Sequence, residues 1–383
     1  MIALRIMLVA GEASGDVHGA DLAREIQKRA PRAKLFGMGG RRMQEAGVRL
    51  LYNPTRLSPI GFVEAVRGLS LFKRLLARFG QVLETQRPNA LVLIDFPGFN
   101  LPLARLAHER GIPVLYYIAP KVWAHGASRV QKLADAVDKM CVIFDFEPPI
   151  FQAAGIDCEF VGNPLVDACR LELDQAAARR ECQLAEGRTT LALLPGSRTQ
   201  EIGSLLPVML EAGKRLAATH PDVQFVLPVA HTLDQTPLRR QVEASGLAVA
   251  IVETGVHKAL RAADAAIVAS GTATLEAALI GTPHVCIYRV SPLGYAVGKM
   301  VVKTPFISLP NIVAQREVIV ELLQRQASAE RIAAETERLL DPVVRARMAD
   351  DFAEIRRRLG ESGAAGRVAE RVITLAEAEV AAQ

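Results

Sequence analysis

The chain has 383 residues, half of them apolar and 23% charged, and it carries a net charge of +5. This balance is typical of a globular enzyme with two domains and excludes a disordered chain. With 5% aromatic residues and no zinc-finger, RRM or basic-zipper pattern, the sequence predicts no nucleic-acid partner.

The first half alternates short apolar runs with helical periodicity, which is typical of βαβ units and a parallel sheet. Helices such as 16–29 and 101–110 fill the intervals. The N-terminal apolar stretch is short and lacks a small-residue cleavage site, so it reads as a first strand rather than a signal peptide. We expect strands at 4–10, 33–38, 90–95, 113–117, 138–143 and 158–161.

The second half repeats this pattern, and after Ser328 only amphipathic helix is expected. Helices are expected to begin near Glu201, Thr272 and Glu317, and strands near 189–194, 223–229, 248–253, 265–269, 284–288 and 306–309.

The break at 162–164 separates two Rossmann-like halves. We therefore predict an α/β protein with domains 1–165 and 172–345, followed by helices 346–383. Another two-lobed α/β protein, such as a periplasmic binding protein, is the alternative, and the missing export signal counts against it.

The cysteines are five scattered residues without a CxxC pair, as expected for free thiols in a reducing compartment. No segment has the ~20 consecutive apolar residues that span a bilayer. We expect a cytoplasmic protein, either soluble or peripheral on a membrane.

The first loop, GEASGDVHG at 11–19, follows a strand and begins a helix. Unpaired N–H groups at such a helix start suit an anion or polar ligand. The alternative is a tight turn with Ser14 or Asp16 as N-cap. Glu12 and His18 are harder to explain by packing, because polar residues at the carboxyl end of a strand usually face a ligand crevice.

Asp95 ends the strand ALVLID and precedes a Pro-Gly turn. A carboxylate in this position is well placed to act as a general base. A helix cap is the alternative interpretation.

Three strand-to-helix turns of the second half are candidate binding sites. In LLPGSR, Ser197 and Arg198 can donate to phosphate oxygens. In SGTATLE, the turn 270–272 (Ser270, Gly271 and Thr272) faces a diphosphate, and Glu276 lies one turn further on, where a carboxylate could take two ribose hydroxyls. After a further predicted strand come Asn311, Gln315, Arg316 and Glu317, which indicate ligand contact or, alternatively, capping.

Two metal-binding patterns are rejected. Asp145 and Glu147 form a DxE, but two prolines follow at once, so we interpret them as residues at a helix start. The histidines show no HExxH spacing or cluster, and no metal or other cofactor is expected.

Residues 57–80 form a basic amphipathic helix with a wide apolar face. Core packing explains such a stripe in part, but the apolar residues exceed what one buried face needs. We therefore predict contact with an anionic membrane surface, which would attract each basic residue by roughly 1 kcal/mol. The contact residues are Phe62, Val63, Val66, Arg67, Leu69, Phe72, Lys73 and Arg74.

Taken together, seven motifs in order resemble the lipid-A-disaccharide synthases of bacterial lipopolysaccharide assembly, over nearly the whole chain. The motifs are GEASGD at 11–16, IDFPGFN at 94–100, APKVWA at 119–124, VGNPLVD at 161–167, LLPGSR at 193–198, SGTATLE at 270–276 and LPNIVAQRE at 309–317.

The resemblance implies a metal-independent, inverting transferase of the GT-B fold, in which two Rossmann-like domains face each other across a cleft and the closing helices cross back. Its donor would be UDP-2,3-diacylglucosamine and its acceptor 2,3-diacylglucosamine 1-phosphate (lipid X), at the cytoplasmic face of the inner membrane. The resemblance makes Asp95 the catalytic base with Glu12 and His18 nearby, and assigns the donor to Arg198, 270–272, Glu276, Asn311, Arg316 and Glu317.

Three alternatives stay open: another UDP-sugar transferase, a UDP-sugar epimerase, and a non-catalytic nucleotide-sugar sensor or membrane scaffold. The oligomeric state is also open, with a homodimer as one alternative.

Overall fold

The structure is a computed structural model that describes residues 3–54, 62–123, 129–229, 235–290 and 304–382, except for the side chains of 62–70. It divides into two compact units. The first comprises Met1–Pro164 with Gly360–Gln383, and the second comprises Leu165–Leu359. The domain boundaries predicted from the sequence lie at 165 and 345, and the prediction treated 346–383 as one segment of helices. The structure instead divides this segment between the two units at Gly360.

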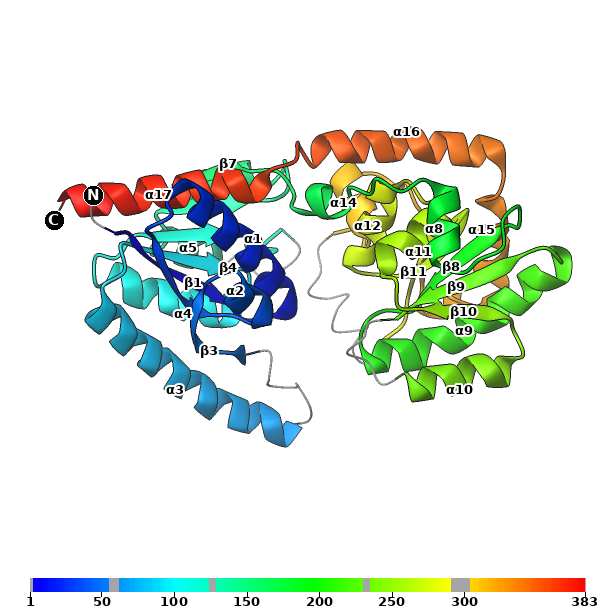
Figure 1. The fold of residues 1–383 in the computed structure, drawn as a ribbon, viewed down its shortest axis with the longest axis horizontal. Helices are drawn as coiled ribbons and strands as arrows, with labels where there is room; N and C mark the ends of the chain where they lie inside the picture. Colours follow the sequence, from blue (N-terminus) through cyan, green and yellow to red (C-terminus); the bar gives the residue numbers. More distant parts are fainter. Residues whose placement is uncertain (1–2, 55–61, 124–128, 230–234, 291–303, 383) are drawn as a thin grey trace. The chain divides into compact units, whose positions relative to one another are not determined.

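The first unit contains a parallel sheet in the order β3-β2-β1-β4-β5-β6-β7 (Figure 1). All six strands predicted in the first half are present, and the short edge strand β3 was missed. The strands are β1 (Arg5–Ala10), β2 (Lys34–Met38), β3 (Arg49–Tyr52), β4 (Ala90–Ile94), β5 (Val114–Tyr117), β6 (Lys139–Val142) and β7 (Asp157–Phe160).

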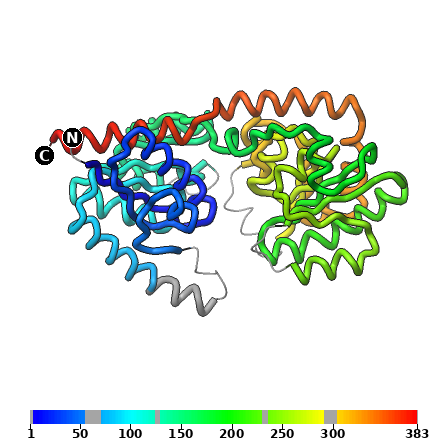
Figure 2. The backbone as a smooth tube through the Cα atoms, in the orientation of Figure 1, coloured from blue at the N-terminus to red at the C-terminus, as the bar shows by residue number. Residues whose placement is uncertain are grey.

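Helices cover both faces of this sheet and bury its apolar strands. On one face, α1 (Ala13–Arg29) packs beside α17 (Ala364–Ala382), the blue and red tubes that meet in Figure 2. On the other face lie α3 (Phe62–Gln86) and α4 (Pro97–His108). The shorter helices are α2 (Arg41–Glu45), α5 (Arg129–Ala134) and α6 (Pro148–Gln152).

Helix α17 belongs to the first unit because it completes one of that unit's core layers. Val368, Ala369 and Val372 are fully buried in the same layer as Leu22 of α1. The Arg367 Nε donates to the carbonyl oxygen of Val161 at 2.8 Å. These contacts attach a distant part of the sequence to the first sheet.

The second unit contains another parallel sheet, in the order β10-β9-β8-β11-β12-β13. Its strands are β8 (Thr190–Leu194), β9 (Gln224–Pro228), β10 (Val249–Val252), β11 (Ala265–Ala269), β12 (His284–Tyr288) and β13 (Glu321–Leu323). Its helices are α7 (Leu165–Ala168), α8 (Gln175–Glu181), α9 (Thr199–Thr219), α10 (Thr236–Ser245), α11 (Val256–Ala262), α12 (Thr272–Ile280), α14 (Leu309–Ala314), α15 (Ala329–Arg338) and α16 (Pro342–Arg358), with a 3-10 turn at Gln324–Gln326.

Two predictions for this unit were wrong. The predicted strand at 306–309 is instead a segment without strand structure that leads into α14, and the expected helix start at Glu317 lies after the end of that helix. The sixth strand is β13, which pairs with β12 through Leu322 and Ile287. The short apolar run before α14 was mistaken for a strand, because so short a run carries little periodicity.

No helix in the described part of the chain is long and apolar enough to cross a membrane. All five cysteines are buried free thiols that form no disulfide.

Asp16 has a structural role that differs from the predicted one. It lies inside α1, whose N-cap is Glu12, and its carboxylate instead caps the start of α2. It accepts hydrogen bonds from the backbone N–H groups of Gly40 at 2.6 Å, Arg42 at 3.0 Å and Met43 at 3.0 Å. The bonds join two helices on the face that also carries α17.

Replacing Asp16 by Ala is expected to lower the free energy of unfolding by about 1–3 kcal/mol, because three N–H groups lose a charged acceptor. Urea denaturation followed by circular dichroism measures the change. The matched control is Asp21→Ala on the same helix, which removes an exposed ion pair with Arg24 and should leave the midpoint nearly unchanged. Equal midpoints for the two variants would contradict the capping role.

Candidate active site

The order of the first sheet reverses between β1 and β4, whose ends pair as Ala10 and Ile94. Ligands of open α/β sheets bind at the carboxyl ends of strands at such a reversal. Glu12 follows one of these strands and Asp95 follows the other, so the structure brings two predicted carboxylates to this point. Glu12 is exposed and Asp95 is half-buried.

The pKa of Asp95 is raised above the ordinary value of an aspartate, chiefly because burial disfavours its charged form. A hydrogen bond from the backbone of Phe96 opposes this shift. The negative charge of Glu12 raises the pKa further, whereas the Lys121 ammonium lowers it. A carboxylate with a raised pKa is a stronger base, as proton abstraction requires.

The backbone of Asp95 is held in a strained conformation. Asp95 and Phe96 have φ angles of 48° and 50°, in the left-handed region. The Asp95 carbonyl accepts hydrogen bonds from Asn100 Nδ2 at 2.6 Å and from the Tyr116 hydroxyl at 2.7 Å. A Cβ at Gly11 would lie 2.0 Å from the Phe96 ring, so glycine is required there. Strain held by such contacts is typical of functional sites.

His18 lies on α1 with its Nδ1 buried and without a hydrogen-bond partner among the described residues. Burial lowers its pKa, against a smaller opposing effect of Asp21, so the imidazole is neutral near pH 7. The Tyr117 ring meets it edge-on at 6.5 Å between centroids. A neutral imidazole can donate or accept one hydrogen bond with a substrate.

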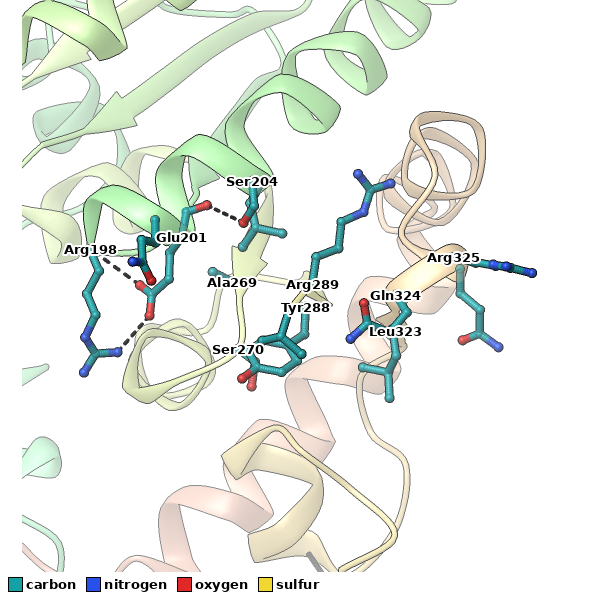
Figure 3. Close-up of a pocket in the computed structure, with 14 residues that line it drawn as sticks. Arg198, Glu201, Ser204, Ala269, Ser270, Tyr288, Arg289, Leu323, Gln324 and Arg325 are labelled. Carbon is teal, nitrogen blue, oxygen red and sulfur yellow. Dashed lines mark hydrogen bonds and ion pairs between the residues drawn. The ribbon is translucent and has the colours of Figure 1, made fainter. Parts of the chain in front are cut away.

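In the second unit, a cavity of about 1390 Å³ lies at the carboxyl ends of β8, β11, β12 and β13 (Figure 3). It brings together Arg198 and Ser270 from two of the predicted turns. The other residues that line it are Gln200, Glu201, Ser204, Leu205, Ala269, Tyr288, Arg289, Val290, Leu323, Gln324, Arg325 and Gln326.

Arg198 is the N-cap of α9 and forms a capping box with Glu201. The Glu201 carboxylate accepts from Arg198 Nη1 at 2.8 Å and from the backbone N–H of Ser197 at 3.2 Å, as the dashed lines in Figure 3 show in part. Gly196, with a φ of 106°, lets this carboxylate approach. The Arg198 side chain is still 78% exposed, so the guanidinium N–H groups that do not contact Glu201 are accessible to an anion.

The turn Ser270-Gly271-Thr272 presents the N-terminus of α12. Gly271 is the N-cap, it has a φ of 151°, and a Cβ there would meet nothing within 4 Å. Thr272 is exposed, while the Ser270 hydroxyl donates to the Ile307 carbonyl at 3.3 Å. The helix start therefore faces open space, where its N–H groups can bind a phosphate.

Glu276 lies one turn further along α12, outside the residues that line the cavity. Its Oε1 is 2.9 Å from His257 Nε2, and His257 also lies 3.8 Å from the Cys169 thiol. This pairing orients the carboxylate and leaves its second oxygen for a ligand. The sequence did not predict His257, because a single histidine 19 residues away gives no local signal.

The predicted contact of Asn311 with a donor is wrong. Asn311 is fully buried, and its amide is engaged by Val318, Ile319 and Glu321. Glu321 also accepts from the Ser308 hydroxyl at 2.6 Å. Asn311 therefore fastens α14 to β13 instead of touching a ligand.

The residues after α14 end a helix and do not begin one. Gln315 is the C-cap, with a φ of 56°, and Glu317 is exposed. The guanidinium of Arg316 binds Asp351 at 2.7 Å and Glu354 at 2.6 Å on α16. Arg316 thus joins two helices of the second unit, which is a structural role that the sequence did not reveal.

Helix α3 spans the predicted membrane-binding segment. Phe72 is partly buried and packs edge-on against Phe99 at 5.2 Å between ring centroids, so part of its ring contacts the core layer. Lys73 and Arg74 are exposed. The side chains of Phe62, Val63, Val66, Arg67 and Leu69 lie outside the described residues.

Glu147 is the N-cap of α6, which confirms that the DxE pattern marks a helix start. It accepts hydrogen bonds from Trp123 Nε1 at 3.0 Å and from the backbone of Ile143 and Phe144. Burial nevertheless raises its pKa to about 7. The carboxylate therefore ties the turn at Trp123 to the end of β6.

Replacing Glu12 by Gln is expected to lower the pKa of Asp95, because a nearby negative charge is removed. Lys121→Met should raise it, since a positive charge is lost. Carboxyl ¹³C chemical shifts followed against pH measure both changes. Glu186→Gln, a charge loss on an exposed residue of the second unit, is the control. Shifts of the same sign in the Glu12 and Lys121 variants would contradict this electrostatic description.

The chain matches the family described as Lipid-A-disaccharide synthetase over residues 6–367. Lipid-A-disaccharide synthase of Geobacter sulfurreducens is 43% identical over 97% of this chain and 97% of its own. The enzyme of the same name from Myxococcus xanthus is 42% identical over 97% of each chain.

Solved structures share the two-sheet architecture at low sequence identity. UDP-GlcNAc 2-epimerase from Neisseria meningitidis, bound to UDP-GlcNAc, has a TM-score of 0.64 at 12% identity, covering 97% of this chain and 100% of that chain. The calicheamicin glycosyltransferase CalG4 has a TM-score of 0.63 at 16% identity, covering 99% of both. These matches show the GT-B fold, and the match over residues 6–367 shows that the chain belongs to the lipid-A-disaccharide synthase family.

Proposed function

We propose that the protein transfers 2,3-diacylglucosamine from its UDP derivative to lipid X, giving the β-1,6-linked tetraacyl disaccharide 1-phosphate and UDP. The family supports the reaction class. The observation that carries the proposal is the half-buried Asp95 carboxylate, whose pKa is raised at the reversal of the first sheet.

In the proposed step, Asp95 accepts the proton of the 6-hydroxyl of lipid X. The hydroxyl oxygen forms a bond to the anomeric carbon of the donor, and the bond from that carbon to the diphosphate oxygen breaks. Its electron pair leaves with UDP, and attack from the opposite side inverts the anomeric configuration. Because the base must be ionised, turnover falls as the pH drops through the raised pKa of Asp95.

The developing charge on UDP needs positive groups that are already in place. The N–H groups at the start of α12 and the exposed Arg198 guanidinium supply them in the second unit. Glu276, oriented by His257, is placed to accept hydrogen bonds from ribose hydroxyls. Ser197, Gln315 and Glu317 are further exposed polar groups of this unit that we assign to the donor site.

Replacing Asp95 by Asn should lower turnover by ~10²–10⁴-fold, because the amide cannot accept the proton. The Kd of UDP should stay unchanged, since UDP binds elsewhere. The measurements are disaccharide formation from the diacyl donor and lipid X, and calorimetric titration with UDP.

Asp157→Asn, at the start of the edge strand β7 of the same sheet and 66% exposed, is the matched control and should keep full activity. Unchanged turnover in the Asp95 variant would favour a protein that binds nucleotide sugars without transferring them. Disaccharide formation from unacylated UDP-glucosamine alone would favour another UDP-sugar transferase.

We also propose that the protein docks on the cytoplasmic face of the inner membrane, because both substrates carry fatty acyl chains. The exposed Lys73 and Arg74 on α3 support attraction to anionic lipid. Phe72 packs part of its ring against Phe99, and we assign the apolar part of the contact to its remaining surface and to other residues of this helix.

The double variant Lys73→Gln and Arg74→Gln should bind anionic vesicles roughly 30-fold more weakly, since each basic residue contributes about 1 kcal/mol. Sedimentation with phosphatidylglycerol vesicles measures this. The double variant Arg24→Gln and Lys28→Gln removes the same charge from α1 and should pellet like the unaltered protein. Equal amounts of the two double variants in the vesicle pellet would contradict the docking proposal.

A further inference from the structure

Gln324 combines two unfavourable features at one position. It follows β13 and begins the 3-10 turn Gln324–Gln326, with a φ of 51° in the left-handed region. Its side-chain Nε2 is buried and has no hydrogen-bond partner in the described part of the chain. A non-glycine residue in this conformation and a buried unpaired donor each cost free energy. A left-handed backbone and a buried unpaired donor are both typical of a residue that contacts a ligand.

The side chain of Gln324 lines the cavity of the second unit. In Figure 3 its amide lies on the side of Tyr288, whereas Arg325 extends away from the cavity. The turn that carries Gln324 is held in place by Arg289, because the Arg289 guanidinium donates a hydrogen bond to the carbonyl oxygen of Ala327. The backbone that carries Gln324 is therefore held beside the cavity.

The surroundings of Gln324 select a neutral ligand group. Arg198 and the α12 N-terminus suit the diphosphate, and Arg289 is bound to backbone. The residues that line the cavity at the ends of β12 and β13 include Leu323, Val290 and the ring of Tyr288, and Arg325 extends away from the cavity. A neutral amide donor beside apolar walls matches a carbonyl oxygen that carries a hydrocarbon chain.

The cavity is also larger than a nucleotide sugar needs. Its volume of about 1390 Å³ exceeds the ~300–1,000 Å³ of common small-molecule pockets. The cavity extends to the ends of β12 and β13, where Gln324 lies. The donor of the proposed reaction has acyl groups on its sugar that require such space.

We propose that Gln324 Nε2 donates a hydrogen bond to an acyl carbonyl of the nucleotide-linked sugar, and so selects acylated over unacylated donors. This inference rests on the proposed function. Gln324 is a specificity residue here and takes no part in proton transfer.

The test is calorimetric binding of three compounds, without acceptor: UDP, UDP-glucosamine and UDP-2,3-diacylglucosamine. In Gln324→Leu the diacyl donor should bind about tenfold more weakly, as expected for one lost hydrogen bond whose acceptor is left unpaired. The Kd values of UDP and UDP-glucosamine should not change. Gln324→Asn tolerates the left-handed backbone but is one methylene shorter, and it should show the same selective loss.

The matched control is Gln183→Leu, because Gln183 also has a left-handed φ of 56° but is exposed outside the cavity. It reports the cost of leucine in this conformation and should bind all three compounds normally. Equal weakening of all three compounds in both Gln324 variants would overturn the inference and indicate a structural role. Unchanged binding of the diacyl donor would overturn it as well.

Failure of the proposed function has a different signature. It would appear as the absence of disaccharide from the unaltered protein and lipid X, whereas the inference concerns a ratio of affinities measured without turnover. An unaltered protein that binds UDP-glucosamine as tightly as the diacyl donor would overturn the inference directly.

Discussion

The reversal of strand order in each parallel sheet is the constraint on which the candidate site depends. At β1 and β4, and again at β8 and β11, the two neighbouring strands continue into helices that diverge. The carboxyl ends of these strands are therefore left uncovered. Asp95 and Glu12 occupy the first opening, and Arg198 and Ser270 occupy the second.

A second layer of interactions holds these openings in shape. The Glu321 carboxylate accepts hydrogen bonds from Ser308 and Asn311, and this fixes the segment whose Ile307 carbonyl receives the Ser270 hydroxyl. In the first unit, Asn100 and Tyr116 perform the same task for the backbone of Asp95. The positions of Ser270 and Asp95 thus depend on hydrogen bonds made by neighbouring side chains that do not themselves contact a substrate in the proposed reaction.

The sequence predicts the strands well where apolar runs are bounded by glycine or proline, because this signal is local. It predicts less well what a polar side chain contacts. Asn311 and Arg316 looked like ligand residues, yet their partners, such as Glu321 and Asp351, come from other elements. His257 and Gln324 escaped notice for the same reason: pairing with Glu276 and the lack of any partner are properties of the folded chain.

The return of the chain to its first unit affects the order in which the protein can be built. Translation releases residues 1–164 first, but the layer that holds Leu22 and Ile26 lacks Val368, Val372 and the rest of α17 until some 200 further residues have been made. The intervening unit, Leu165–Leu359, is continuous in sequence and can close as soon as it has emerged. The N-terminal sheet, although made first, is therefore the last to receive its complete apolar cover.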